Sequence, residues 1–231
     1  MIEVEEVTHV YGEGHGARTV LRDVTVTLAE RRVGIVGANG SGKSTFARMI
    51  NGLVVPTAGR VRVDGLDTRT DGRKVRRRVG FCFTNPDAQI VMPTVREDVA
   101  FGLRRRGLSR DDVRERVAAV LERFGLASHA DHPTHLLSGG QKQLLALASV
   151  LVTEPAVIVL DEPTTLLDLR NARLVTDHLA RLHQQVVLVT HHLELLGGYD
   201  RVLVFDEGRL VHDGPPEPAV AAYRRLMTGT P

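Results

Sequence analysis

The stretch Gly37-Ala38-Asn39-Gly40-Ser41-Gly42-Lys43-Ser44 decides the fold, because it matches the pattern of a phosphate-binding loop. The apolar run 33–36 predicts a strand before the loop, and residues 44–51 predict a helix after it. Glycines let the backbone amides of such a loop close on phosphate oxygens at a helix N-terminus, whose partial positive charge favours an anion. Residues 37–45, Thr45 included, therefore predict a nucleotide site, with Lys43 at the outer phosphates and the Ser44 hydroxyl available to Mg²⁺.

A strand that ends in two acids is the second predicted part of this site. The run 157–160 is wholly apolar, and Asp161 and Glu162 follow it directly. Two buried carboxylates side by side are costly unless a cation or a proton compensates. We expect Asp161 to hold Mg²⁺ through water, as the acid of this strand does in phosphate-loop enzymes. We expect Glu162 to orient or deprotonate the water that attacks the γ-phosphate.

The pentapeptide Leu137-Ser138-Gly139-Gly140-Gln141, here called the signature segment, lies between the phosphate loop and the acidic strand. Ser138 is suited to cap the helix that follows, because a serine hydroxyl accepts a bond from a free amide of the first turn. Taken alone, the segment would be an ordinary helix cap. An exposed helix N-terminus is also an anion site, so the position between Lys43 and Asp161 favours a role in nucleotide binding.

The remaining sequence predicts an α/β protein. Alternating apolar and polar residues in the first 30 or so positions predict antiparallel strands. After residue 157, strands alternate with helices, which predicts parallel pairing in a doubly wound sheet. We expect a single domain over residues 1–231, with a helical subdomain inserted at roughly 85–150 and a helical pattern from 94 to 127. The basic cluster 73–78 is interpreted as a solvated face at the start of a strand.

Composition indicates a cytosolic globular protein. No run approaches the ~20 apolar residues of a membrane-spanning helix. The N-terminus lacks the basic and apolar segments of a secretory signal. The single cysteine, Cys82, excludes an intramolecular disulfide and fits a reducing compartment. Because Cys82 lies in an apolar run, we expect it to be buried.

The three motifs, in this order over nearly the whole chain, resemble the nucleotide-binding subunit of ATP-binding-cassette (ABC) transporters. The resemblance implies that ATP is held between two head-to-tail subunits, by the phosphate loop of one and the signature segment of the other. The signature residues involved are Ser138, Gly139, Gly140 and Gln141. The resemblance also implies that Asp168 lies in a loop that crosses the dimer interface. It implies further that the switch histidine His191 contacts the γ-phosphate and that Tyr11 stacks on adenine.

Three positions depart from the family pattern. Thr84 follows the strand 79–83, where the family has a glutamine that touches Mg²⁺ and senses the membrane partner. Threonine offers an oxygen with a shorter reach, so Thr84 is a weaker candidate ligand, and Gln89 is not an obvious substitute by spacing. Our hypothesis is that hydrolysis persists, with water completing the coordination. Leu166 replaces a usually small residue near the dimer crossing, and His192 follows the switch histidine.

The stretches 85–91 and 93–102 narrow the resemblance to the ATPases of energy-coupling-factor (ECF) importers, which take up vitamins such as biotin or ions such as cobalt and nickel. This implies a peripheral subunit on the cytoplasmic face of the membrane. Its partners would be a second ABC ATPase subunit, a membrane scaffold protein and a substrate-binding membrane protein. The solute, and whether the ATPase pair is a homodimer or a heterodimer, stay open.

Two other functions are weighed against this one. A soluble ABC-type ATPase acting on nucleic acid or ribosomes would need a long coiled-coil insertion or a second cassette, and the chain has neither. A catalytically weakened partner subunit is disfavoured because Lys43, Glu162 and His191 are all present. The basic cluster 73–78 has no interleaved aromatic residues to stack on bases, so we expect no nucleic-acid partner. The histidines near residue 132 match no metal-ligand spacing.

Overall fold

The computed structural model describes residues 1–104 and 106–229, and the chain divides into two compact units. The first unit comprises Met1–Val79, Val157–Asp161 and the described residues from Gln184 onward. The second unit comprises Gly80–Ala156 and Glu162–His183. No helix in the described part of the chain is long and apolar enough to span a membrane.

An antiparallel sheet opens the first unit. Its strands lie in the order β2-β1-β4-β5 and span Arg18–Leu28, Ile2–Tyr11, Ala58–Val63 and Leu66–Asp67. Alternate residues of β1, such as Ile2 and Val4, are buried, as expected for a strand with one face on the core. The antiparallel strands predicted near the N-terminus are confirmed.

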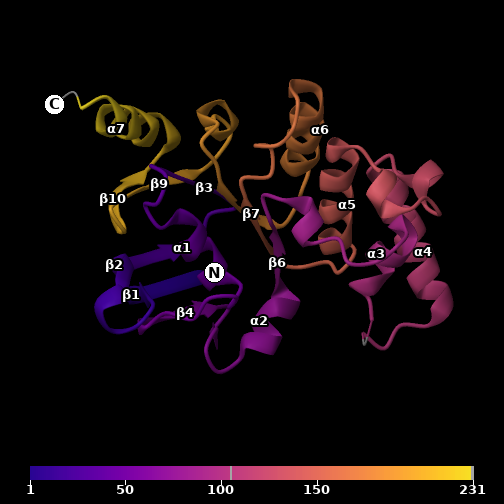
Figure 1. The fold of residues 1–231 in the computed structure, drawn as a ribbon, viewed down its shortest axis with the longest axis horizontal. Coiled ribbons are helices and arrows are strands. Elements are labelled where there is room, and N and C mark those ends of the chain that lie inside the picture. The colour runs from indigo at the N-terminus through magenta and orange to yellow at the C-terminus, as the bar shows by residue number, and fades with distance from the viewer. Residues whose placement is uncertain (105, 230–231) are drawn as a thin grey trace. The chain divides into compact units, whose positions relative to one another are not determined.

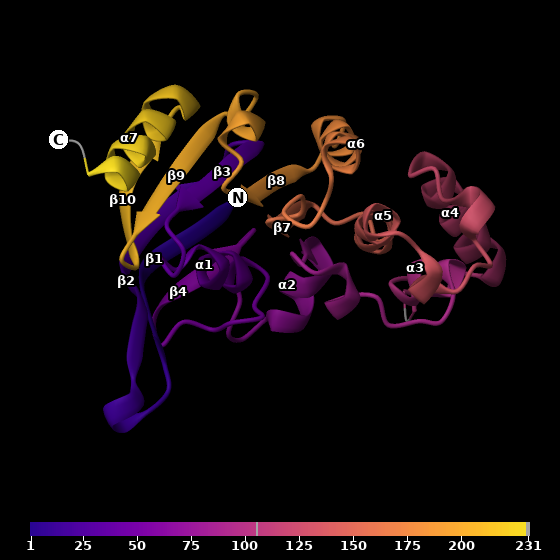
Figure 2. The same ribbon diagram turned by 45° about the horizontal axis from the view of Figure 1, so that its top comes forward.

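A second, mainly parallel sheet follows the order β10-β9-β3-β8-β7 within the first unit (Figure 2). These strands span Arg209–Gly214, Arg201–Asp206, Arg32–Gly37, Gln185–Val189 and Val157–Asp161. Only β10 runs antiparallel to its neighbour. The central strands are continuous apolar runs buried on both faces, which is characteristic of parallel sheets. This confirms the predicted α/β fold with an antiparallel β portion.

Three helices complete the first unit: α1 (Lys43–Ile50), α2 (Gly72–Arg78) and α7 (Pro216–Thr228). The ring of Phe46 on α1 lies 4.9 Å from that of Phe205 on β9, which fastens α1 to the sheet. Helix α7 lies along β9 and β10 (Figure 1). The basic residues of the cluster 73–78 are exposed, as predicted, but they lie on the helix α2, which ends directly before the strand that begins at Val79.

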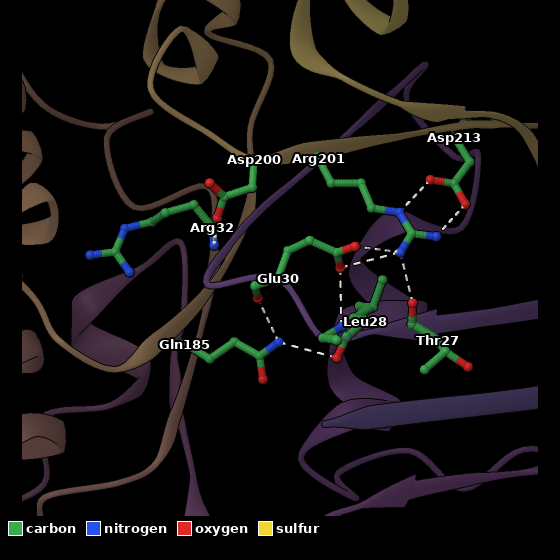
Figure 3. A network of polar contacts seen from close by, with 9 residues as sticks. Thr27, Leu28, Glu30, Arg32, Gln185, Asp200, Arg201 and Asp213 are labelled. Atoms are coloured by element: carbon green, nitrogen blue, oxygen red, sulfur yellow. Dashed lines mark hydrogen bonds and ion pairs between the residues drawn. The ribbon is translucent and has the colours of Figure 1, made fainter.

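Hydrogen bonds and ion pairs connect the segment between β2 and β3 with strands β8, β9 and β10 (Figure 3). The Arg201 guanidinium donates to both carboxylate oxygens of Asp213, at 2.5 and 2.6 Å, and to Glu30 at 3.0 and 3.2 Å. It also donates to the Thr27 carbonyl at 2.8 Å. Gln185 donates to the carbonyls of residues 28 and 30. The two carboxylates raise the pKa of Arg201 well above its ordinary value, so the cation persists at all relevant pH.

The second unit is mainly helical. It contains α3 (Val95–Phe101), α4 (Arg110–Arg123), α5 (Gly139–Leu151) and α6 (Leu169–Ala180), and most of strand β6 (Val79–Cys82). Helices α3, α4 and α5 pack on one another (Figure 1). Short 3₁₀ turns of this unit lie at Pro86–Ala88, Ala127–His129 and Thr134–Leu136, and those of the first unit lie at Gly14–Gly16 and Leu193–Leu196. The helical pattern predicted over 94–127 is two helices with a break between them.

A buried carboxylate organises the segment that resembles the ECF ATPases. Asp98 on α3 is 4% exposed and accepts bonds from the amides of Val91 and Met92 at 2.9 and 3.1 Å. The Ser149 hydroxyl on α5 donates to the same carboxylate at 2.8 Å. Asp98 therefore holds residues 91–92 against the helices of the second unit. The predicted bounds of the helical subdomain, 85–150, lie within this unit, which also takes up residues 162–183.

Candidate functional site

The phosphate loop joins β3 to α1 in the first unit, as the sequence predicts. Gly42 occupies the N-cap position of α1 with φ of 99°, a left-handed conformation that favours glycine. A Cβ atom there would lie 2.7 Å from the Val20 carbonyl oxygen and 2.7 Å from a Leu21 methyl carbon. No side chain caps this helix. The amides of its first turn therefore have no side-chain acceptor and are available to an anion.

Lys43 is 6% exposed and stabilises the loop from inside. Its ammonium donates to the carbonyls of Gly37 and Ala38 at 2.8 and 2.7 Å. Ser41 Oγ is buried and has no hydrogen-bond partner among the described residues, which suits a group that awaits a polar ligand. Asn39 and Gly40 form the exposed tip of the loop, and Thr45 is buried on α1.

Asp161 and Ser44 meet at the end of the parallel sheet. Asp161 is 1% exposed at the end of β7, and its Oδ1 accepts a bond from Ser44 Oγ at 2.8 Å. Arg48 Nη2 lies 3.5 Å from the other carboxylate oxygen. A hydroxyl and a carboxylate side by side are the oxygen ligands that Mg²⁺ takes, so the donor set fits this ion. The structure thus brings together two residues 117 positions apart, Ser44 and Asp161, that the sequence assigns to one site.

Two further predicted residues lie in the first unit. Tyr11 ends β1 with 43% of its surface exposed, as a base-stacking platform requires. Its ring stands edge-to-face against that of His9, with centroids 4.5 Å apart. Burial lowers the pKa of His9, so this ring is neutral at physiological pH. His191 is exposed beyond β8, and its ring lies 4.2 Å from that of His192.

Glu162 belongs to the second unit and has an unusual backbone. Its φ is 54°, in the left-handed region that a glutamate rarely adopts. The Thr165 hydroxyl donates to Glu162 Oε2 at 2.7 Å. Strained backbone of this kind persists where the surrounding structure imposes it, often at functional sites. Other described glutamates, such as Glu6 and Glu207, also have positive φ, so the catalytic role of Glu162 stays a prediction.

The signature segment begins α5 with a complete capping box. Ser138 Oγ accepts a bond from the Gln141 amide at 3.3 Å, and Gln141 Oε1 accepts one from the Ser138 amide at 2.9 Å. Ser138 and Gly139 are exposed, whereas Gly140 is buried. A Cβ atom on Gly140 would lie 2.3 Å from the side chain of Asn171, so only glycine fits without a shift. The helix start predicted at Ser138 is confirmed.

Asp168 lies close to the signature segment through the same asparagine. Asp168 caps α6, and its carboxylate accepts bonds from the Asn171 amide and side chain at 2.8 and 3.1 Å. Leu166 and Leu169 flank it and are 63% and 92% exposed. The second unit therefore presents two exposed leucines beside the residue that the resemblance places at the dimer crossing.

Three contacts in the second unit could not be foreseen from spacing. Gln89 Oε1 accepts a bond from the Phe83 amide at 3.1 Å, and its Nε2 donates to the Ala146 carbonyl at 3.0 Å. The Gln89 side chain is thus bonded to Phe83, the residue before Thr84. Its amide oxygen and its amide nitrogen both already have partners. His129 Nε2 lies 3.1 Å from Gln141 Nε2 of the signature segment. Cys82 is fully buried, as predicted.

Comparison with known families agrees with these motifs. A family model described as "ABC transporter" matches residues 21–165. A biotin transport ATP-binding protein, BioM, from Rhizobium etli is 50% identical over 93% of the chain and 96% of its own length. The energy-coupling factor transporter ATP-binding protein EcfA1 from Symbiobacterium thermophilum is 45% identical over 97% of the chain and 83% of its own length.

Solved structures show the same fold. The chain superposes on cbiO1 from Clostridium perfringens, described as part of the ABC transporter complex cbiONQ, with a TM-score of 0.82 and 33% identity. That match covers 99% of this chain and 93% of the other. The ATP-binding cassette MJ0796, solved as a dimer with ADP and Pi, gives a TM-score of 0.84 at 29% identity, over 94% and 99% of the two chains.

Proposed function

This chain belongs to the ABC transporter family, and from that premise we propose that it hydrolyses ATP to drive a membrane importer of the ECF type. The contact between Ser44 on α1 and Asp161 on β7, at 2.8 Å, is the observation that carries this proposal. This hydrogen bond joins the phosphate loop to the acidic strand within the first unit. A chance Gly-rich turn would have no reason to meet a buried carboxylate.

The phosphate loop binds the nucleotide in this proposal. The amides at the uncapped start of α1 contact the phosphates, and the Lys43 ammonium neutralises the charge of the outer ones. The Gly37 and Ala38 carbonyls position that ammonium at the loop. Tyr11 supplies an aromatic face for adenine, and His9 holds its ring.

Ser44 and Asp161 would hold Mg²⁺, which would neutralise charge on the phosphates as they react. Glu162 orients the attacking water and accepts its proton. Residue 162 is fixed by its backbone conformation and by the Thr165 hydroxyl. His191, exposed after β8, contacts the γ-phosphate and links ATP to the end of that strand. Thr84 has too short a reach to replace the family glutamine, so water completes this part of the site.

A second ATPase subunit completes each site. The exposed residues Ser138 and Gly139 then face the γ-phosphate held by the partner's phosphate loop. Asp168 crosses between the subunits, flanked by the exposed leucines. The dimeric arrangement of the similar cassette MJ0796 supports this assembly. Closure of the pair on ATP performs the mechanical work, and hydrolysis reopens it.

The importer partners follow from the ECF-like relatives. The segment 85–102, held by Asp98, would contact a membrane scaffold protein on the cytoplasmic face. A separate membrane protein would bind the solute, a vitamin such as biotin or a transition-metal ion such as cobalt or nickel. The names of the relatives, a biotin transport protein and an ECF ATPase, support this solute class. We expect no nucleic-acid partner.

The experiment is affinity purification of the tagged chain from membranes in mild detergent, followed by ATPase assay of what is recovered. We expect two membrane proteins and a second ATPase subunit, and Mg²⁺-dependent ATP hydrolysis. Recovery of ribosomes or DNA would overturn the importer assignment. Absence of Mg²⁺-dependent hydrolysis in the recovered complex would overturn the enzymatic one.

A further inference from the structure

The His129 side chain contacts the signature segment from the 3₁₀ turn Ala127–His129, within the second unit. Its Nε2 lies 3.1 Å from Nε2 of Gln141, and its Nδ1 lies 3.1 Å from Ser128 Oγ. The His132 ring stands edge-to-face against the His129 ring, with centroids 4.9 Å apart. His129 and Gln141 are both half-buried. The function proposed above gives His129 no part.

The capping box decides which atoms meet in this contact. The Ser138 amide can only donate, so the Gln141 atom that lies 2.9 Å from it is the carboxamide oxygen. The amino group of Gln141 therefore faces His129, and Nε2 of the ring accepts its hydrogen bond. A neutral imidazole has one donor nitrogen and one acceptor nitrogen. The proton of the ring therefore lies on Nδ1, which donates to Ser128 Oγ.

A charged His129 cannot keep this arrangement. An imidazolium carries a proton on both nitrogens, so Nε2–H would face the Gln141 amino group, a donor against a donor. Rotation of the carboxamide would turn its oxygen to His129, but it would place the amino group against the Ser138 amide. Protonation of His129 therefore costs either the contact with the ring or the capping bond at Ser138.

The elements around His129 carry other charged and titratable groups. These are Arg96 on α3, Glu122 and Arg123 at the end of α4, Lys142 on α5, and Asp131, His132 and His135 in the connecting loop. The Arg96 guanidinium donates to both carboxylate oxygens of Asp131 at 3.1 Å. The Lys142 ammonium donates to Asp87 at 2.7 Å. Both cations therefore have carboxylate partners of their own.

We propose that His129 is a positioning residue for the signature segment: in its neutral form it holds the Gln141 carboxamide, which in turn fixes the cap at Ser138. Ser138 and Gly139 are exposed at the helix start, where they face the ATP of the second subunit in the proposed function. His129 acts on ATP hydrolysis through these groups and does not touch the nucleotide. The inference rests on the proposed function and extends it to a residue outside the signature segment.

The test compares ATP hydrolysis by the assembled transporter with variants at position 129, at about pH 8. His129→Ala removes the acceptor, and we expect kcat to fall about fivefold, the effect of one lost hydrogen bond. His129→Gln should stay within about twofold of the native chain, because its Oε1 takes the place of Nε2. His129→Lys offers only donors and should be at least as impaired as His129→Ala.

Two controls separate this effect from nucleotide binding and from general damage. The Kd of ATP for the isolated full chain should be unchanged in all these variants, because the phosphate loop belongs to the other unit. His135→Ala is the matched control, because His135 is an exposed histidine on the neighbouring 3₁₀ turn. Its kcat should equal that of the native chain, and an equal fall in His135→Ala would overturn the assignment to His129.

The pH profile distinguishes positioning from a merely structural role. Histidines change charge between about pH 5 and 8, so His129 loses its acceptor as the pH falls. The ratio of native activity to that of His129→Gln should fall about fivefold from about pH 8 to about pH 5.5. Titration of groups common to both chains, such as His191, cancels in this ratio. A constant ratio, or a His129→Gln variant as impaired as His129→Ala, would overturn the proposal.

A second measurement needs no catalysis. In the isotope-labelled full chain, the NMR signals of the Gln141 side-chain amide are assigned by their absence in Gln141→Ala. They should shift over the same pH range in the native chain and stay fixed in His129→Gln. Fixed signals in the native chain would overturn the contact itself. If these signals shift but the native complex does not hydrolyse ATP, the proposed function fails while the contact stands, so the two failures are distinguished.

Discussion

Two helix N-termini, one in each unit, carry glycines and face predicted phosphate, yet they are built in opposite ways. Helix α1 begins at Gly42 with no side-chain cap, so its first amides remain available. Helix α5 begins at Ser138 with a full capping box, so the Gln141 amide is already satisfied. Free amides at a helix start are the donors that an anion uses.

Because of this difference, we expect the two helix starts to have different roles. In the proposed function the first unit would bind the nucleotide on its own, because its loop leaves donors free and adds the Lys43 ammonium. In the signature segment the capping box occupies the amides of Ser138 and Gln141, which leaves the Ser138 hydroxyl and the Gly139 amide for the ATP that, in the proposed function, another subunit holds. Binding should therefore depend on α1, whereas dimer closure should depend on α5.

The largest expected effect comes from Glu162→Gln, which removes the proton acceptor and preserves the shape of the side chain. ATPase activity should fall by ~10³-fold, within the range for loss of a general base. ATP binding should persist, so size-exclusion chromatography with ATP and Mg²⁺ should show a stable dimer. A variant that binds ATP but stays monomeric would contradict the role of α5 in a shared site.

The variants Lys43→Ala and Ser138→Ala test which of the two helix starts determines the affinity of the isolated chain for ATP. Removal of the Lys43 ammonium should weaken ATP binding to the isolated chain by about 100-fold, because a buried charge pair with phosphate is lost. Ser138→Ala should leave that affinity within about twofold. Calorimetric titration with ATP measures both. Equal losses in the two variants would remove the distinction between the helices.

Glycine replacement tests the backbone of the two starts. Gly42→Ala places a Cβ atom 2.7 Å from a carbonyl oxygen at positive φ, and we expect the free energy of unfolding to fall by about 2 kcal/mol. Gly139→Ala is the matched control, because a Cβ atom there meets nothing within 4 Å. Urea unfolding of both variants gives the comparison. If Gly139→Ala lowered the free energy of unfolding and Gly42→Ala did not, the expected difference between the two helix starts would be contradicted.

The smallest effect is expected from loss of the cap on α5. Ser138→Ala removes the acceptor of the Gln141 amide and should cost about 1 kcal/mol, or a fall in Tm of roughly 2–4 °C. Gln141→Ala removes the reciprocal bond, so the double variant should lose less than the sum of the two. Thermal unfolding followed by circular dichroism measures this. Strict additivity would show that the box does not act as a unit.

Local patterns made both helix starts predictable. Ser138 carries its capping partner three residues on, and the glycines before Lys43 specify the loop by their spacing. For the exposed cluster 73–78 the sequence did not indicate the helix α2, because Val75 is its one buried residue and a single apolar position gives no helical period. The pattern over 94–127 concealed a break, at which Gly107 has positive φ and Ser109 caps a new helix.

Contacts between distant residues could not be predicted in the same way. That Ser44 and Asp161 belong to one site was expected only because both lie in known motifs, and their direct hydrogen bond was not predicted. Gln89 at the Phe83 amide, His129 at Gln141 and Asp98 at Ser149 follow from tertiary packing, which no periodicity records. The roles of the site residues themselves stay predictions for the experiments above.

The polar network around Arg201 affects when the phosphate loop can reach its folded surroundings during synthesis. Glu30 and Arg32 lead into the phosphate loop, and they bond to residues far along the chain: Glu30 to Arg201, and Arg32 to Gln184 and Asp200. Strand β3 likewise pairs only with β8 and β9. A nascent chain therefore displays its phosphate loop long before the strands that flank it exist. Nucleotide binding becomes possible late in synthesis, when most of the 231 residues have left the ribosome.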